Sequence, residues 1–296
     1  MSAEELRPVE QLFAARPTED GDGVKIRRVA GQGILPALDP FLMLDEIAAD
    51  EAADYIGGFP MHPHRGFSTV TYMLEGRMRH QDHMGNEGVL GPGDAQWMDA
   101  ASGVLHSEMP EQREGRLHGF QLWVNLPAAM KMQAPAYREV SAGDIPSLLI
   151  DRAQINVIAG VVQARANGVT EHVTGPIQGR ACAVDIAMIR FAEGAELNLR
   201  VPEEKNTLIY AADGAVTVRA RSGLRQIPSG HLARLGAGDA VALSTQDFSS
   251  AMVLAGRPLR EPVAHWGPFV MNTPEEIERA ITDYREGQLV TLQPMP

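Results

Sequence analysis

The most informative stretch of the chain covers residues 57–76 and reads GGFPMHPHRGFSTVTYMLEG. Its second half, from Phe67 onward, is rich in β-branched and aromatic residues and ends at Gly76, which predicts a strand. His62 and His64 come just before this strand and are separated by one proline. Residues i and i+2 of a strand project to the same face, so both imidazoles are expected to point the same way.

Similar strand patterns recur along the chain, and they indicate an all-β protein. They lie at residues 24–31 (VKIRRVAG), 117–127 (LHGFQLWVNLP) and 214–221 (GAVTVRAR). The exception is the C-terminal segment NTPEEIERAITDYREG. It offers Thr273 as N-cap, Pro274 at the first helical position, Glu276 to complete a capping box and Gly287 as a stop. We expect a short helix there.

The composition narrows the class of protein. Of 296 residues, 44% are hydrophobic, which is enough for a substantial core, and the formal net charge of −12 argues against direct binding of nucleic acid. The single cysteine, Cys182, excludes internal disulfides and is expected to be a small buried hydrophobe. The N-terminus lacks the pattern of a secretory signal, and no apolar run approaches the roughly 20 residues of a membrane span. We expect a cytoplasmic protein with no membrane partner.

Two echoes suggest an internal duplication. YMLEG (72–76) resembles YAADG (210–214) at an offset of 138 residues, and LGPGDA (90–95) resembles LGAGDA (235–240) at an offset of 145. The strand pattern breaks near residues 125–137. We therefore predict two β-domains, one at residues 1–135 and one at residues 136–296, the latter ending in the helix.

A second pair of polar residues has the same spacing as the histidine pair. His106 and Glu108 stand in WMDAASGVLHSEMP (97–110). A lone His-x-His is usually an ordinary surface feature, but two such pairs within one repeat copy favour convergence on a metal. Three imidazoles and a carboxylate suit one divalent first-row ion, such as iron, manganese, cobalt, nickel, copper or zinc. Four protein ligands on an octahedral ion leave two positions for water, O₂ or substrate.

The second copy serves as an internal control. The offset of 138 carries the first pair onto Arg200 and Pro202, and the offset of 145 carries the second pair onto Ala251 and Val253. None of these residues replaces an imidazole or carboxylate ligand. We predict one metal per chain, in the N-terminal half.

Further polar residues have weaker signals. His80, Asp82 and His83 either line the mouth of the pocket or belong to a solvated hairpin, and the hairpin is favoured. His118 and Gln121 could supply a hydrogen bond to a ligand imidazole. They have opposite strand parity, so at most one of them faces the metal.

The remaining candidates are expected to be structural. Ser107 is turned away from the metal by strand parity, and His265 is assigned to the second copy without a ligand partner. Packing residues, some of which could instead build an apolar pocket, are Phe59, Met61, Phe67, Met73, Trp97 and Met98.

Several segments together resemble the pirin family of the cupin superfamily. They are DPFLMLDE (39–46), FPMHPHRGFSTVTYMLEG (59–76), GPGDAQWM (91–98), GVLHSEMP (103–110), HGFQLWVNLP (118–127) and GPFVMNTPEEI (267–277). The resemblance implies two stacked cupin barrels of the double-stranded β-helix or jelly-roll type. It also implies one metal, usually iron, held by His62, His64, His106 and Glu108. The sequence departs from the family at Ser68, where pirins have a glutamate.

The resemblance implies two different activities. Several pirins are quercetin 2,3-dioxygenases, which open a flavonol ring with O₂, and Glu108 would be the candidate general base in such a reaction. Other pirins are regulators that bind a transcription factor or metabolic enzyme, with the metal as redox sensor. We expect Fe²⁺, a small aromatic substrate and a monomer, because two barrels in one chain can satisfy each other's packing.

Overall fold

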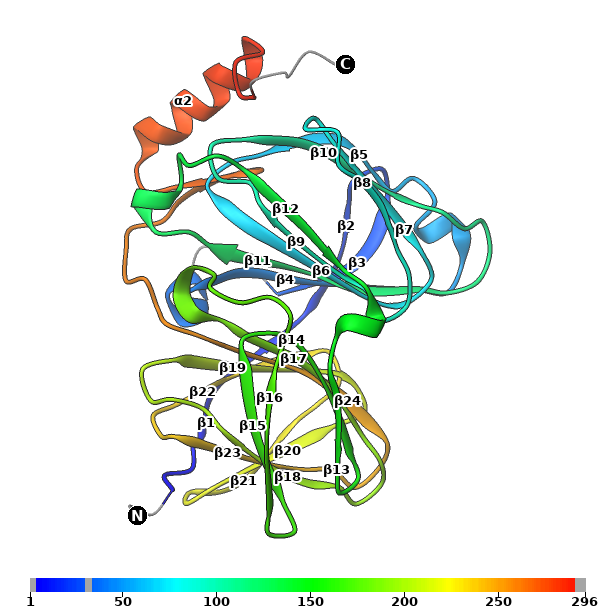
Figure 1. The fold of residues 1–296 in the computed structure, drawn as a ribbon, viewed down its shortest axis with the longest axis vertical. Helices are drawn as coiled ribbons and strands as arrows, with labels where there is room; N and C mark the ends of the chain where they lie inside the picture. Colours follow the sequence, from blue (N-terminus) through cyan, green and yellow to red (C-terminus); the bar gives the residue numbers. More distant parts are fainter. Residues whose placement is uncertain (1–3, 30–33, 291–296) are drawn as a thin grey trace. The chain divides into compact units, whose positions relative to one another are not determined.

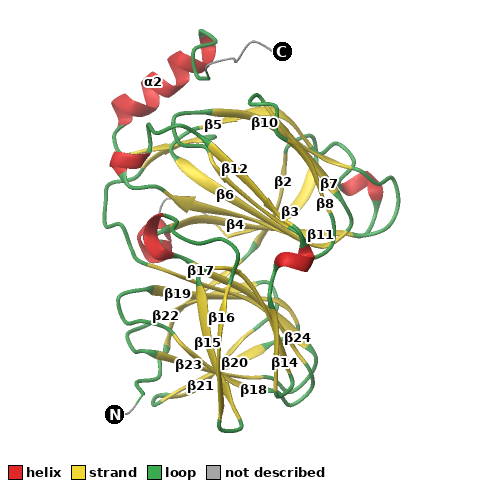
Figure 2. Cartoon of the chain, in the orientation of Figure 1, coloured by secondary structure: helices red, strands yellow, loops and turns green. Residues whose placement is uncertain are grey.

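The computed structural model describes residues 4–29 and 34–290 and confirms an all-β fold with one long helix (Figures 1 and 2). The chain divides into two compact units. The first barrel comprises the described residues of 16–36, 41–142 and 259–296, and the second barrel those of 1–15, 37–40 and 143–258. This differs from the expected division at residue 135. The N-terminal strand belongs to the second barrel, and the C-terminal segment belongs to the first.

The first barrel is built from two main sheets and a hairpin. Its sheets have the strand orders β12-β9-β6-β11-β4-β3-β2 and β5-β10-β7-β8, and the hairpin is β25-β26. The strands are β2 (Arg16–Asp20), β3 (Val24–Val29), β4 (Phe41–Ala49), β5 (Phe59–His64), β6 (Phe67–Glu75), β7 (Met78–Asp82), β8 (Glu87–Leu90), β9 (Ala95–Asp99), β10 (Val104–Pro110), β11 (Leu117–Asn125), β12 (Ala136–Val140), β25 (Ala264–Trp266) and β26 (Phe269–Met271).

The second barrel repeats this topology. Its sheets have the orders β1-β22-β19-β24-β17-β14-β13 and β16-β15-β18-β23-β20-β21. The strands are β1 (Val9–Ala14), β13 (Ser147–Ile150), β14 (Ala153–Ala159), β15 (Val161–Ala166), β16 (Val169–Thr174), β17 (Asp185–Phe191), β18 (Glu196–Arg200), β19 (Asn206–Asp213), β20 (Val216–Ala220), β21 (Gly223–Ile227), β22 (His231–Leu235), β23 (Ala240–Ser244) and β24 (Ser249–Gly256).

Among the described residues, α2 is the one helix of more than a single turn. The α-helices are α1 (Leu35–Leu38) and α2 (Pro274–Arg285), and the 3₁₀ turns are η2 (Ala52–Asp54), η3 (Ala128–Met130), η4 (Ala142–Asp144) and η5 (Ala181–Ala183). Helix α2 begins with the expected capping box between Thr273 and Glu276. Within the described residues, no helix combines the length and apolar character needed to cross a bilayer.

The C-terminal segment returns to the first barrel at the end of β5. Ile277 and Ala280 of α2 pack against Phe269 and Met271 of the β25–β26 hairpin. Gly66, at a φ of 93°, follows β5, and a Cβ atom there would lie 1.9 Å from the carbonyl oxygen of Val270. Only glycine permits this close approach of the two backbones.

The two barrels differ in what fills them. A continuous core of aliphatic side chains occupies the second barrel, including Leu197, Leu199, Val241 and Leu243. In the first barrel the apolar residues form smaller clusters, and a cavity of about 600 Å³ lies inside.

Candidate metal centre

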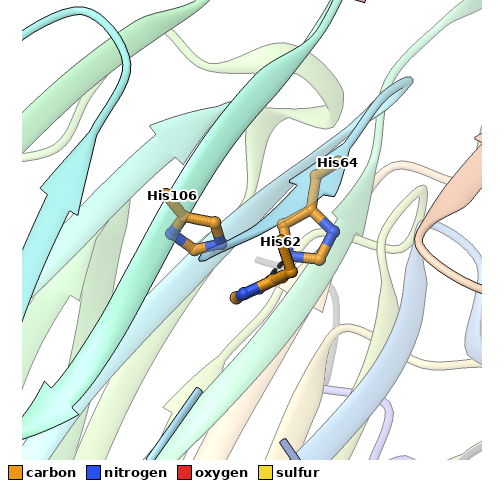
Figure 3. A group of neighbouring side chains, drawn as sticks. All are labelled: His62, His64 and His106. Atoms are coloured by element: carbon orange, nitrogen blue, oxygen red, sulfur yellow. Dashed lines mark hydrogen bonds between the residues drawn. The ribbon is translucent and has the colours of Figure 1, made fainter. Parts of the chain in front are cut away.

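Three histidines of the first barrel come together on two neighbouring strands. His62 and His64 lie on β5, and the antiparallel register sets His106 of β10 directly opposite His62. One nitrogen from each ring lies within 4.8 Å of the others, and the ring centroids are 4.3, 4.7 and 4.9 Å apart. Figure 3 shows the three imidazoles turned toward one another. The strand spacing in the sequence therefore brings together the predicted histidines.

The hydrogen bonds of these rings fix where their protons are. Nδ1 of His62 lies 2.8 Å from the carbonyl oxygen of Pro60, and Nδ1 of His64 lies 3.4 Å from that of Pro268. A carbonyl oxygen only accepts, so each Nδ1 carries the proton and each Nε2 carries a lone pair. These two Nε2 atoms lie 3.1 Å apart, and Nε2 of His106 is buried without a hydrogen-bond partner. Converging lone pairs of this kind fit a cation.

Burial keeps the rings of His64 and His106 neutral. Burial, with the nearby His62, lowers the pKa of His64 well below its usual value. Burial also lowers the pKa of His106, and the rings of His64, His62 and His80 add to the effect. Neutral imidazoles are the form that binds metals.

Glu108 belongs to an overlapping group of possible ligands. Its carboxylate lies within 4.8 Å of ligand nitrogens of His80 and His106, whereas the tight group of three contains only histidines. The register between β10 and β5 shifts after His106, so that Glu108 pairs with Phe59. Such a bulge re-aims the side chains around it.

Two polar side chains hold the Glu108 carboxylate. The amide of Gln121 donates to its Oε2 at 2.9 Å. The hydroxyl of Thr71 lies 3.1 Å from its Oε1 and 2.8 Å from Oε1 of Gln121. Both side chains come from the large sheet, on β11 and β6, so their contacts with the carboxylate connect the two sheets at the cavity wall.

The expected solvated hairpin around His80 is wrong. His80 is fully buried and Asp82 nearly so, because β7 pairs with β10 along its whole length. Burial alone would raise the pKa of Asp82, but the nearby His80 ring and the hydrogen bonds from Asn86 lower it. His83 is half-buried and accepts a hydrogen bond from the backbone of Leu105 at 3.3 Å.

The cavity of about 600 Å³ extends from the histidines across the first barrel. Its lining is mainly apolar, with Met43, Ile47, Phe59, Met73, Met78, Phe120 and Trp123. Its polar wall includes Arg28, whose guanidinium donates to Asp45 at 2.6 and 2.8 Å and also contacts Asp20. A volume of this size suits one small organic molecule.

The parity argument for His118 and Gln121 is correct. Gln121 lines the cavity and contacts Glu108, whereas Nε2 of His118 lies 2.9 Å from Glu46 Oε1 on β4. The contact of Gln121 is with the carboxylate and not with an imidazole.

The structure corrects the assignment of His265. It was assigned to the second copy, but it lines the cavity of the first barrel together with Gly267 and Pro268. Its ring centroid lies 6.0 Å from that of Trp123. Sequence reasoning missed these residues because the return of the C-terminal segment depends on long-range packing. The resemblance of residues 267–277 to the pirin family was the signal in the sequence that could have placed this segment at the first barrel.

The expected packing residues divide into three groups. Phe59 and Met73 line the cavity, Phe67, Trp97 and Met98 are buried, and Met61 is 57% exposed. Cys182 is half-buried rather than fully buried, in a turn where its φ is +65°.

Ser68 faces away from the cavity. It lies three positions before the cavity-lining Thr71 on β6, so it projects to the opposite face. Its hydroxyl donates to Asp99 Oδ1 at 2.6 Å, and the indole of Trp97 donates to the same oxygen at 2.6 Å. The residue that replaces the family glutamate therefore lies outside the metal centre.

The second barrel has aliphatic residues where the first has histidines and Glu108. In sheet order, β18-β23-β20-β21 corresponds to β5-β10-β7-β8. Val241 pairs with Leu199 there, as His106 pairs with His62, and the register then aligns Val201 with His64 and Leu243 with Glu108. All four are buried in the core and cannot bind a metal.

The residues expected at these positions, Arg200, Pro202, Ala251 and Val253, were therefore wrong. The LGPGDA echo misled the alignment. Its first copy precedes β9, but its second precedes β23, which corresponds to β10. The offset of 138 was one residue too large for His62 and His64.

Comparison with known proteins agrees with this arrangement. The Pirin family matches residues 23–124, and the Pirin C-terminal cupin domain matches residues 186–290. A Caulobacter vibrioides protein named "Pirin-like protein" is 45% identical over 289 residues, covering 96% of this chain and 99% of its own. A Vibrio cholerae protein named "Putative quercetin 2,3-dioxygenase" is 43% identical over 290 residues, covering 96% and 98%.

A solved structure matches over the same extent. Quercetin 2,3-dioxygenase from Acinetobacter baumannii has a TM-score of 0.85 at 30% identity, and the match covers 97% of this chain and all of that one. The match therefore includes both barrels, also the second one, which has aliphatic residues in place of the three clustered histidines. With two cupin barrels and two matching family domains, the chain belongs to the pirin family.

Proposed function

We propose that this protein is a metal-dependent dioxygenase of the quercetin 2,3-dioxygenase type, which opens a flavonol-like ring with O₂. One observation carries the proposal. One ring nitrogen from each of three imidazoles lies within 4.8 Å of the others beside a mainly apolar cavity of about 600 Å³, and the buried Nε2 of His106 has no hydrogen-bond partner among the described residues. The names of the relatives from Vibrio cholerae and Acinetobacter baumannii support the same reaction.

The metal ligands in this proposal are His62, His64, His106 and Glu108. Fe²⁺ is the ion we favour, and manganese, cobalt, nickel, copper and zinc suit the same donors. A divalent ion held there supplies positive charge, which lowers the pKa of a coordinated hydroxyl and stabilises its anion.

Glu108 takes the role of general base. Its carboxylate is fixed at the cavity wall by Gln121 and Thr71, within the reach of a substrate that enters beside the histidines. It would accept the proton of the flavonol hydroxyl. Phe59, Phe120 and Trp123 provide aromatic surface against which a flat ring packs, and they exclude water from the reacting face.

The test measures O₂ uptake with quercetin by protein loaded in turn with iron, manganese and nickel. We expect uptake with at least one ion and none from the His106→Ala variant. The matched control is His172→Ala, since His172 is exposed on β16 of the second barrel. No uptake at full metal occupancy, with any of the ions, would remove the proposal.

A specific contact also supports the regulatory alternative. Arg65, next to His64, forms an ion pair of 2.7 Å with Asp283 of helix α2, so the metal-binding strand is tied to an outer element. A regulator would use this link to report the metal's oxidation state to a protein partner. Such a partner should bind ferrous and ferric protein differently in a pull-down, and equal binding would exclude the redox switch.

A further inference from the structure

A third pair of polar residues with strand spacing lies beside the metal centre. His80 and Asp82 are on β7, which pairs with β10 on the side opposite to β5. The register sets Asp82 opposite His106 and His80 opposite Glu108. Three adjacent strands therefore carry His-x-His, His-x-Glu and His-x-Asp, and the mechanism above leaves the last pair unused.

The contacts of His80 determine the positions of its protons. A carboxylate only accepts, so Oδ2 of Asp82, which lies 3.5 Å from Nε2 of His80, favours the proton of His80 on Nε2. This contact is too loose to count as a hydrogen bond, but it leaves the lone pair of His80 on Nδ1, which lies 3.3 Å from the side-chain nitrogen of Gln96.

That tautomer sets the proton of His106. Nδ1 of His106 lies 3.4 Å from Nδ1 of His80, which accepts, so Nδ1 of His106 must donate. The lone pair of His106 is therefore on Nε2, the atom without a partner among the described residues. His62 and His64 obtain the same tautomer from backbone carbonyls, whereas His106 obtains it from a side chain.

Further contacts hold His80 and Asp82 in place. Oδ1 of Asp82 accepts the backbone N–H groups of Met84 and Asn86 at 2.9 and 3.0 Å, and Oδ2 accepts the Asn86 amide at 2.8 Å. The ring of Tyr137 stacks on that of His80 with centroids 4.6 Å apart and planes at 18°. Neither side chain of the pair can turn away without losing several contacts.

We propose that His80, oriented by Asp82, is a positioning residue that holds the proton on Nδ1 of His106 and so directs the Nε2 lone pair to the metal. The proposal rests on the metal centre of the proposed function but not on the dioxygenase reaction. Hydrogen-bond partners of this kind typically change metal affinity by about 10- to 100-fold.

The test compares two substitutions of His80 by their affinity for Zn²⁺ and Fe²⁺, measured by chelator competition. His80→Phe keeps the stack on Tyr137 but cannot accept the hydrogen bond from Nδ1 of His106. We expect its metal affinity to be 10- to 100-fold lower. His80→Asn loses the stack but places an acceptor oxygen near the Nδ1 position, and we expect much of the affinity to return. A packing role predicts the reverse order. His172→Phe is the matched control.

A second variant tests the carboxylate. Asp82→Asn removes the negative charge next to His80, which makes Nε2 of His106 a weaker electron-pair donor to the metal. The Fe³⁺/Fe²⁺ reduction potential, measured by spectroelectrochemistry, should therefore rise. Circular dichroism establishes that each variant is folded.

Three outcomes would overturn the inference. They are equal metal affinity of the His80→Phe and wild-type proteins, stronger binding by His80→Phe than by His80→Asn, and X-ray absorption showing His80 itself bound to the metal. A protein that binds metal with this order of affinities but leaves quercetin unchanged would retain the inference and lose the proposed function. A wild-type protein that binds none of the ions would lose both.

Discussion

The Nε2 atoms of His62 and His64 lie 3.1 Å apart, and each ring has its Nδ1 beside a backbone carbonyl oxygen. With the proton of each ring on Nδ1, the two Nε2 atoms present lone pairs to each other. Their repulsion, in a site that also contains the unpartnered Nε2 of His106, is relieved by a cation bound to all three. We therefore expect a bound cation to stabilise this centre.

Metal binding should stabilise the first barrel. At a free metal concentration of about 1,000 times Kd, the free energy of unfolding rises by about 4 kcal/mol, if the unfolded chain does not bind. The measurement is thermal unfolding with and without Zn²⁺ or Fe²⁺. His106→Ala should abolish the shift in Tm and His172→Ala should keep it. An identical shift in both variants would show that the metal acts elsewhere.

The metal-free protein should lose stability in mild acid. The pKa values of His64 and His106 are lowered in the folded state, mainly by burial. Below a pH of about 6.5 the unfolded chain binds protons that the folded chain does not. The free energy of unfolding therefore decreases as the pH is lowered. The slope is up to about 1.4 kcal/mol per pH unit for each histidine.

Urea unfolding of the metal-free protein at several pH values measures this slope. His106→Leu should flatten it, and His172→Ala should leave it unchanged. A free energy of unfolding that stays constant below pH 6.5 would contradict the lowered pKa values.

The sequence predicted the part of the site that depends on local geometry. His62 and His64 face the same way because side chains alternate along a strand, and His106 meets them because β10 pairs with β5. His80 has the same spacing relative to Asp82, but its burial depends on β7 pairing with β10, which local spacing does not reveal.

Long-range packing explains the other misassignments. His265 lies about 200 residues from His62 and lines the same cavity, because the chain returns to the first barrel after completing the second. The two barrels were correctly predicted from their echo. The equivalent positions could be aligned only once the ladders of β18 and β23 were known.

The second barrel should affect stability but not metal content. Leu243 is buried in its aliphatic core, at the position that corresponds to Glu108. Leu243→Ala should lower the free energy of unfolding by about 2–5 kcal/mol, because it leaves a cavity. Elemental analysis of the folded variant should still find one metal per chain. If a folded variant lost its metal, the view that the second barrel contributes to stability but not to metal binding would be wrong.

Gln121 should matter for catalysis more than for metal binding. Gln121→Leu removes the 2.9 Å hydrogen bond to Glu108 and frees the carboxylate to move. One such bond to a charged group is worth about 1.5–3 kcal/mol, so kcat with quercetin should fall about tenfold or more. Gln226→Leu, at an exposed position on β21, is the matched control. Unchanged kcat would remove Gln121 from the mechanism.

Anomalous diffraction from crystals of the iron-loaded protein tests the central claim most directly. We predict one anomalous peak per chain, within bonding distance of Nε2 of His62, His64 and His106 and of the Glu108 carboxylate, which is about 2.0–2.2 Å for such ligands. No peak between these histidines, or a peak in the second barrel, would contradict the account.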